Sequence, residues 1–275
     1  MANQILRSLM VSKAWGWSLL RLGLLIYLGL CAYAFFFSDS LLFQPRSSSY
    51  EDNEAIIKLP VPNGEKIAAI HLPNPDADFT ILYSHGNGED LGDMMFLFHE
   101  LRVGGFAVFA YDYRGYGTSD GKPSEQRVYQ DINAAYRYLT QTLEVPPERI
   151  IALGRSLGGG PSIDLATREP LGGLILESTF TTVFRVMTHI SILPFDKFPN
   201  IGKLDRVNCP VLVIHGTADN TIPLHHGKQL FEAAKEPKQA FWVEGAGHNN
   251  LWSVAGDRYL ETLRTFAHSL PEPSS

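Results

Sequence analysis

The chain has 275 residues, of which 45% are hydrophobic and 19% are charged, and its net charge is -6. This balance is typical of a globular protein that can bury one large core. The sequence has no long basic stretch, and phosphate binding requires clustered Lys and Arg, so nucleic acid is excluded as a partner. Cys31 and Cys209 lie far apart, which excludes a disulfide framework and a Cys-x-x-Cys metal or redox pair.

Residues 15–37 form an apolar stretch whose only charge is Arg21. At about 1.5 Å per residue a helix of this length spans roughly 34 Å, enough for the hydrocarbon core of a bilayer. Arg21 lies about one turn inside Trp15 and Trp17, where its long side chain can reach the headgroups beside an interfacial aromatic belt. We therefore predict a transmembrane helix over 15–37.

Basic residues are distributed unevenly around this stretch. Arg7, Lys13 and Arg21 precede its apolar core, whereas only Arg46 follows within the flanking window. The positive-inside rule then predicts a cytoplasmic segment over 1–14 and a catalytic domain on the non-cytoplasmic side.

Two cleavage signals compete with a retained helix. Ala32-Tyr33-Ala34 resembles a signal-peptidase site, but cleavage there would leave a new N-terminus that begins with three exposed phenylalanines. Residues 28–31 resemble a lipoprotein box, but the bulky Leu30 before Cys31 argues against it. We favour the retained helix.

The chain beyond the apolar stretch divides by composition. Residues 38–53 are polar and serine-rich and predict a linker. Residues 54–270 carry the alternation of apolar runs expected of one globular domain, and 271–275 are a short tail. Eight runs have the length and composition of strands: 56–59, 66–72, 79–84, 106–111, 150–154, 174–177, 211–215 and 239–243.

Amphipathic segments separate the later runs, with apolar faces of helical spacing. The three clearest faces are Leu91, Met94, Met95, Phe98 and Leu101; Val128, Ile132, Ala135, Leu139 and Leu143; and Ala255, Tyr259, Leu263 and Phe266. Two opening strands followed by a strand–helix alternation predict an α/β fold, with a mostly parallel eight-stranded sheet covered by helices on both faces. In such folds ligands bind at the carboxyl ends of the strands.

A Gly-x-Ser-x-Gly pentapeptide, Gly154 to Gly158, follows the strand run that starts at Ile150. In this motif a strand turns sharply into a helix and exposes the serine hydroxyl above the sheet. Ser156 is therefore the candidate nucleophile. A serine between two glycines is, taken alone, more often a tight turn, so partners are needed to support this interpretation.

Two such partners follow later strands. Asp219 comes just after the run 211–215, and His248 follows the run 239–243. A serine hydroxyl needs an imidazole base, and the imidazole needs a carboxylate that fixes its tautomer. The order Ser, Asp, His is that of α/β-hydrolases. Each residue alone has a plainer explanation as a turn or loop residue, and Glu177, at another strand end, is the alternative carboxylate.

An acyl-transfer site also needs donors for the oxyanion. The backbone N–H of Leu157, next after the serine, is one candidate. The loop that follows the run 79–84 reads Ser-His-Gly-Asn-Gly, and from it we favour Asn87, with Gly88 as the alternative. The histidines show no metal-ligand spacing, and no cofactor is expected.

Residues 178–209 lie between two core strands, where this architecture usually inserts a small cap. Eight apolar residues recur in it: Phe180, Phe184, Met187, Ile190, Ile192, Leu193, Phe195 and Phe198. They are explained either by packing against the sheet or by an acyl-chain pocket.

Several of these motifs occur together and in order over roughly residues 55–270. They read SHGNG at 84–88, YDYRGYG at 111–117, GKPSE at 121–125, GRSLG at 154–158, VIHGTAD at 213–219 and WVEGAGHN at 242–249. The chain resembles the α/β-hydrolase superfamily, and within it the small-cap, membrane-associated branch that includes eukaryotic protein depalmitoylases. The depalmitoylases have an N-terminal cluster of lipidated cysteines, whereas this chain has only Cys31 there, which favours an anchored hydrolase that faces away from the cytoplasm.

The resemblance implies the α/β-hydrolase fold, a serine esterase or thioesterase without a cofactor, and the triad Ser156, Asp219 and His248. The expected partners are an acyl substrate that is lipid-like or a small molecule, and the bilayer. The alternatives are a serine peptidase of similar fold and a non-catalytic binding protein. Acyl-chain length, leaving group and oligomeric state do not follow from the sequence.

Overall fold

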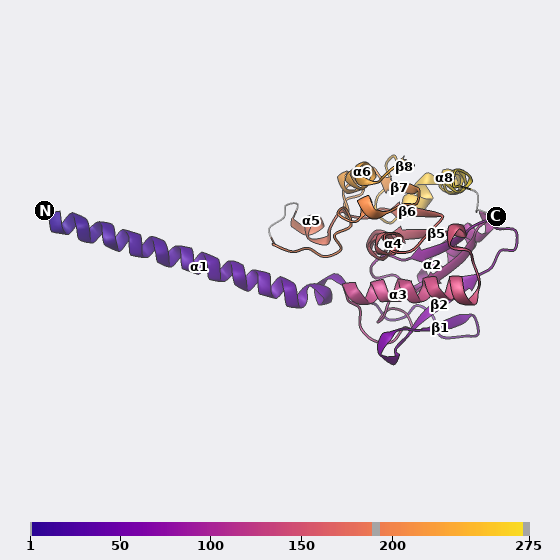
Figure 1. The fold of residues 1–275 in the computed structure, drawn as a ribbon, viewed down its shortest axis with the longest axis horizontal. Helices are drawn as coiled ribbons and strands as arrows, with labels where there is room; N and C mark the ends of the chain where they lie inside the picture. Colours follow the sequence, from indigo (N-terminus) through magenta and orange to yellow (C-terminus); the bar gives the residue numbers. More distant parts are fainter. Residues whose placement is uncertain (1, 189–192, 272–275) are drawn as a thin grey trace. The chain divides into compact units, whose positions relative to one another are not determined.

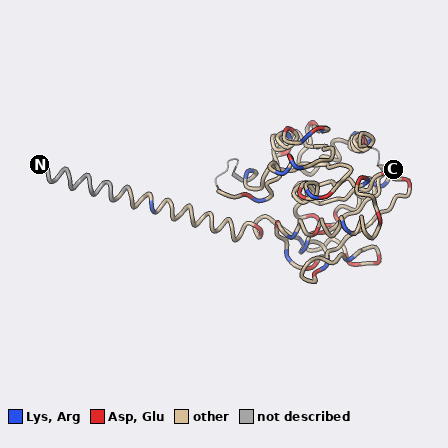
Figure 2. Tube along the Cα trace, viewed as in Figure 1, with Lys and Arg blue, Asp and Glu red and all other residues tan. Residues whose placement is uncertain are grey.

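The structure is a computed structural model that describes residues 2–188 and 193–271, without the side chains of 2–14, 16, 187 and 188. It divides into two compact units, Met1–Leu42 and Phe43–Ser275. The first unit is a single helix, α1 (Ala2–Leu42) (Figure 1). Among the described residues, one stretch is long and apolar enough to cross a membrane, Trp17–Leu42, with a mean hydropathy of 1.9. Figure 2 shows a single basic and a single acidic band along it, Arg21 and Asp39.

Helix α1 extends beyond the predicted 15–37 at both ends. At its carboxyl end it includes 38–42, the first five residues of the expected linker. No glycine or proline occurs between Cys31 and Gln44, and Pro45 is the first residue that disfavours a helix before it. The polar composition of 38–53 therefore does not mark the end of the helix.

The second unit contains one eight-stranded sheet, which confirms the predicted α/β-hydrolase fold. Its strand order is β1-β2-β4-β3-β5-β6-β7-β8. Strands β1 and β2 are antiparallel to each other, β2 is antiparallel to β4, and all later neighbours are parallel. The strands are β1 (Ile56–Pro60), β2 (Lys66–Leu72), β3 (Thr80–Ser84), β4 (Ala107–Tyr111), β5 (Ile150–Arg155), β6 (Gly173–Glu177), β7 (Val211–Gly216) and β8 (Lys238–Val243).

Helices cover both faces of this sheet (Figure 1). The helices of this unit are α2 (Leu91–Val103), α3 (Glu125–Arg137), α4 (Gly159–Ala166), α5 (Val183–Thr188), α6 (Leu224–Ala233), α7 (Leu251–Ala255) and α8 (Asp257–His268), of which α5 lies to one side of the sheet. Side chains of α2, α7 and α8 share one buried cluster with alternate strand residues such as Ile81 and Tyr83. Leu82, between them, is fully buried on the opposite face, because successive strand residues point to opposite sides. Helices α3 and α4 pack against each other, and α4 packs on β5.

The carboxyl ends of the parallel strands are level with one another. Residues paired across neighbouring strands are Ser84 with Gly154, Arg155 with Glu177, and Gly216 with Val243. The loops that follow β3, β5, β7 and β8 therefore leave the sheet along one edge. This edge is where the candidate residues meet.

Candidate active site

Ser156 sits on a strained turn at the end of β5. Its φ is 52°, in the left-handed region that residues with a side chain rarely adopt. Its carbonyl accepts a hydrogen bond from Thr179 Oγ1 at 2.6 Å. A Cβ at Gly158 would collide with the carbonyl of Ser84, so the chain crosses the end of β3 at a distance that only glycine permits. This backbone holds the hydroxyl at the sheet edge, as the motif predicts.

The structure brings the three triad candidates into one hydrogen-bonded chain. Ser156 Oγ lies 3.0 Å from His248 Nε2, and His248 Nδ1 lies 2.7 Å from Asp219 Oδ2. Both distances are within hydrogen-bonding range. Ser156 and Asp219 are buried, and the His248 side chain is 12% exposed. The arrangement can pass a proton from the serine to the imidazole while the carboxylate stabilises the cation.

Asp219 is held as an anion. Its second oxygen, Oδ1, accepts hydrogen bonds from the amides of Thr221 at 2.9 Å and Ile222 at 2.8 Å. Burial raises the pKa of Asp219, but the hydrogen bonds from His248 and Ile222 outweigh burial and lower the pKa below its ordinary value. His215 Nε2 donates to the Ile222 carbonyl at 2.8 Å and so braces the same turn.

The loop after β3 contains the expected oxyanion donor. Asn87 Oδ1 accepts a hydrogen bond from the Tyr116 hydroxyl at 2.6 Å. At the base of the loop, Tyr113 donates its hydroxyl proton to the His85 carbonyl at 2.7 Å. The His85 ring lies 3.3 Å from Asp112; burial lowers the pKa of His85, but this carboxylate raises it by more. The amides of Asn87 and Leu157 as oxyanion donors stay a prediction.

The chain is similar to several known proteins. A family model described as serine aminopeptidase, S33, matches residues 75–196. Alpha/beta hydrolase domain-containing protein 17B of Homo sapiens is 43% identical over 208 residues, which cover 74% of this chain and 71% of that protein. The chain belongs to the α/β-hydrolase superfamily.

Two further proteins place this hydrolase among its relatives. Alpha/beta hydrolase domain-containing protein aho-3 of Caenorhabditis elegans is 46% identical over 200 residues, 70% of this chain, and the match spans only 59% of the nematode protein. An esterase of Pyrococcus furiosus superimposes with a TM-score of 0.68 at 18% identity, over 83% of this chain and 99% of that one. The likeness to the esterase concerns the fold.

Arg155, which was not predicted as a site residue, contacts three of the loops that surround the candidate site. Its guanidinium forms an ion pair with Glu89, and its Nε lies 3.4 Å from Glu177 Oε1. Glu89 belongs to the loop of residues 85–90 after β3, which we call the oxyanion loop for its predicted role. It also donates to the His248 carbonyl at 3.2 Å and to Asn249 Oδ1 at 3.0 Å. Arg155 thus connects the turn at Ser156, the loop after β3 and the loop that carries His248. The sequence does contain a signal for such a residue, because Arg155 is a charged residue at the end of an apolar strand.

Glu177 is not the triad carboxylate, because His248 Nδ1 bonds to Asp219. Glu177 instead accepts a hydrogen bond from the Tyr259 hydroxyl, 2.5 Å from Oε2, and pairs with Arg155. Burial raises the pKa of Glu177, although Arg155 and Tyr259 oppose this. Its role is to fasten α8 and Arg155 to the end of β6.

The described part of the cap is built of packed aromatic rings. Phe198 is fully buried, and its ring centroid lies 5.6 Å from that of Tyr129 and 6.2 Å from that of Phe180. Phe184 and Phe195 pack against each other at 6.0 Å. Ile190, Ile192 and the side chain of Met187 lie outside the described residues. Packing explains Phe180 and Phe198, and the acyl-chain pocket stays a prediction.

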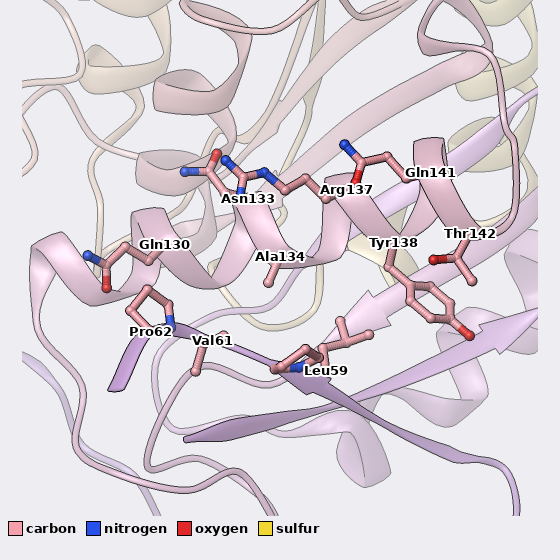
Figure 3. A pocket seen from close by; sticks show the side chains of 11 residues that line it. Leu59, Val61, Pro62, Gln130, Asn133, Ala134, Arg137, Tyr138, Gln141 and Thr142 are labelled. Carbon is pink, nitrogen blue, oxygen red and sulfur yellow. The ribbon is translucent and has the colours of Figure 1, made fainter. Parts of the chain in front are cut away.

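One cavity lies away from the three triad candidates. Figure 3 shows it between β1 and α3, with a volume of about 670 Å³ and a lining that includes Leu59, Asn133, Arg137 and Tyr138. A smaller cavity of about 210 Å³ reaches His248 and is also lined by Arg155 and Trp252. Within the described ranges, no group of three or more His, Cys, Asp and Glu side chains could hold a metal ion.

We expect Arg155→Met to destabilise the hydrolase by about 3 kcal/mol, because its removal leaves the buried carboxylate of Glu177 and the partly buried one of Glu89 without their cation. Arg168→Met is the matched control, since Arg168 forms a partly exposed ion pair with Asp164 at 2.7 Å. The control should lose less than about 1 kcal/mol. Denaturant unfolding measures both variants. Equal losses would contradict the central role of Arg155.

Proposed function

We propose that this hydrolase is a membrane-anchored serine enzyme that cleaves carboxylic ester or thioester bonds through Ser156, His248 and Asp219. The observation that carries the proposal is the position of His248, whose two ring nitrogens lie within hydrogen-bonding distance of the serine and the carboxylate. This is the constellation that acyl transfer requires, and it stands at the carboxyl ends of parallel strands.

In the acylation step, Ser156 Oγ attacks the substrate carbonyl carbon while its proton passes to His248 Nε2. The imidazolium then gives this proton to the departing alcohol or thiol, and an acyl-serine remains. Asp219 stays ionised throughout, keeps the Nδ1 proton directed toward itself and stabilises the cation. The lowered pKa of Asp219 suits this role.

In the second step, His248 removes a proton from water, whose oxygen attacks the acyl carbonyl. The tetrahedral species collapses, Ser156 recovers its proton, and the carboxylic acid leaves. In both steps the developing negative charge would be held by the amides of Leu157 and Asn87. Such donors are effective because they are oriented before the reaction begins.

An acyl substrate fits three features of the chain. The cap contributes aromatic side chains, among them Phe198, which packs on α4 directly after the Ser156 turn. The apolar stretch Trp17–Leu42 would keep the enzyme at a bilayer, where acylated molecules collect. The P. furiosus protein that shares the fold is an esterase. We infer acylated lipids, proteins or small molecules as the substrate class.

A fluorophosphonate probe should label the wild-type enzyme covalently and should not label Ser156→Ala, because only an activated serine attacks the probe. Ser162→Ala is the matched control, since Ser162 is also buried, six residues further on in α4. The control should be labelled like the wild type. Equal labelling of all three proteins would contradict the assignment, and no labelling of any would favour a non-catalytic binding protein.

A serine peptidase is the second candidate, because the matched family model is described as a serine aminopeptidase. An aminopeptidase needs an acidic group for the substrate ammonium, and the buried Glu177 is already engaged by Arg155 and Tyr259. We therefore expect p-nitrophenyl esters to be cleaved at least about 100-fold faster, in kcat/KM, than aminoacyl anilides. Preferred cleavage of the anilides would make the enzyme a peptidase.

For the topology, we propose that the N-terminus faces the cytoplasm and the catalytic domain lies on the other side. The basic residues Arg7, Lys13 and Arg21, set against Arg46, support this orientation. A reporter enzyme fused after Ser275 that works only outside the cytoplasm should be active, and one that works only in the cytoplasm should be inactive. The reverse pair of results would place the domain in the cytoplasm.

A further inference from the structure

Residues 43–50, which follow α1 and belong to the predicted linker 38–53, lie along the oxyanion loop. The backbone N–H of Gln44 points at Asn87 Oδ1, 3.0 Å away, and at the Tyr116 hydroxyl oxygen, 3.1 Å away. The Tyr116 hydroxyl itself donates to Asn87 Oδ1. One end of the 43–50 segment thus fixes the side chain of the residue whose amide we assign to the oxyanion.

The next residues of the segment continue along the loop. The Arg46 guanidinium lies over Gly88, where an added Cβ would be 3.4 Å from its Nε. Ser49 donates its amide to Asp90 Oδ2 at 2.7 Å and its hydroxyl to Asp90 Oδ1. Asp90 is also the N-cap of α2 and accepts from the Asp93 amide at 3.2 Å. The loop is therefore fastened where it enters the helix.

The far end of the segment reaches the base of the loop. The Tyr50 hydroxyl donates to Asp112 Oδ2 at 2.5 Å, and burial together with Asp112 raises the pKa of Tyr50, which keeps this proton in place. Asp112 Oδ1 accepts from the Leu91 amide at 3.0 Å and lies 3.3 Å from His85 Nε2. One carboxylate thus joins the 43–50 segment to both ends of the oxyanion loop.

The first residue of the segment, Phe43, packs against the cap. Phe43 is 4% exposed, and its ring centroid lies 6.2 Å from that of Phe198. Phe198 packs so closely on α4, the helix after the nucleophile, that a Cβ at Gly160 would collide with its ring. The first residue after α1 is therefore part of the aromatic cluster beside the catalytic edge.

The oxyanion loop needs such external support. Between β3 and α2 it contains Gly86 and Gly88, and Gly88 has a φ of 73°. Glycine leaves the backbone free to rotate, so side-chain contacts must set the direction of the amides. An oxyanion donor works only when it is oriented in advance, and a displacement of about 1 Å can cost about 100-fold in rate.

We propose that the 43–50 segment is a positioning element of the active site, which holds the oxyanion loop in its working conformation through Asn87, Asp90 and Asp112. The segment acts through the backbone amides of Gln44 and Ser49 and through the hydroxyls of Ser49 and Tyr50, whereas the exposed side chains of Gln44 and Ser47 lie outside this role. This inference rests on the proposed serine-hydrolase function, because an oxyanion loop matters only for acyl transfer.

The central experiment compares Gln44→Pro with Gln44→Ala in the full-length, detergent-solubilised enzyme. Proline removes the N–H that bonds Asn87, and Pro45 already restricts residue 44 to the extended backbone that proline accepts. Alanine keeps the N–H and removes only an exposed side chain. We expect Gln44→Pro to lower kcat for a p-nitrophenyl ester by about 10- to 100-fold, with KM within about twofold. Gln44→Ala should retain the wild-type kcat.

A second pair of variants tests the contact between Ser49 and Asp90, and it replaces the first pair if Gln44→Pro does not fold. Ser49→Ala removes the hydroxyl that bonds Asp90, and the exposed Ser47 gives the matched control Ser47→Ala. We expect Ser49→Ala to lower kcat by about 3- to 10-fold with an unchanged unfolding midpoint, and Ser47→Ala to leave kcat unchanged.

The outcomes separate the inference from the function on which it rests. Wild-type kcat in both Gln44→Pro and Ser49→Ala, or a fall in kcat that the controls share, would overturn the positioning role. A fall in kcat that is matched by a fall in thermal midpoint would also overturn it, because the segment would then be structural only. An inactive wild-type enzyme that no probe labels would instead refute the proposed function.

Discussion

The candidate active site depends on the backbone of Ser156. A serine at a φ of 52° costs roughly 1 to 3 kcal/mol and persists only where its surroundings allow no alternative. Thr179 bonds its carbonyl from one side, and the glycines at 154 and 158 let the turn close against the end of β3. Every other functional group is placed relative to this turn, since the parallel strands end level with it.

Around the turn, each buried charged side chain has partners that compensate its charge. Arg155 lies between the carboxylates of Glu89 and Glu177, and Asp219 faces His248 and two backbone amides. In a region shielded from water, an unpaired charge would be costly, and a fully bonded one is rigid. The result is a set of dipoles fixed before a substrate arrives, which is the condition under which electrostatic stabilisation of a transition state is large.

Much of this could be predicted from the sequence. The apolar runs predicted each strand to within a residue or two, and the level carboxyl ends of parallel strands explain why Ser156, Asp219 and His248 meet although up to 92 residues separate them. The motif also predicted the strained turn. These features follow from the periodicity of apolar residues and from the order of motifs along the chain, and both can be read from the sequence.

Other features could not be predicted from the sequence. Arg155 pairs with Glu177 across adjacent strands, a consequence of register, but its contact with Glu89 depends on how a glycine-rich loop folds. The residues after Phe43 were predicted to be a linker because they are polar, whereas two of the hydrogen bonds that order them come from the backbone amides of Gln44 and Ser49. Backbone donors exist in every residue but proline, so no side-chain pattern marks them.

The burial of Phe43 has a practical consequence for protein engineering. Composition alone would suggest that a soluble version of the domain should start near residue 54, after the polar stretch. Such a version would lose an aromatic side chain from the cap and three anchoring points of a catalytic loop. The compact unit begins at Phe43, so a water-soluble variant suited to crystallisation or assay should keep this residue as its first.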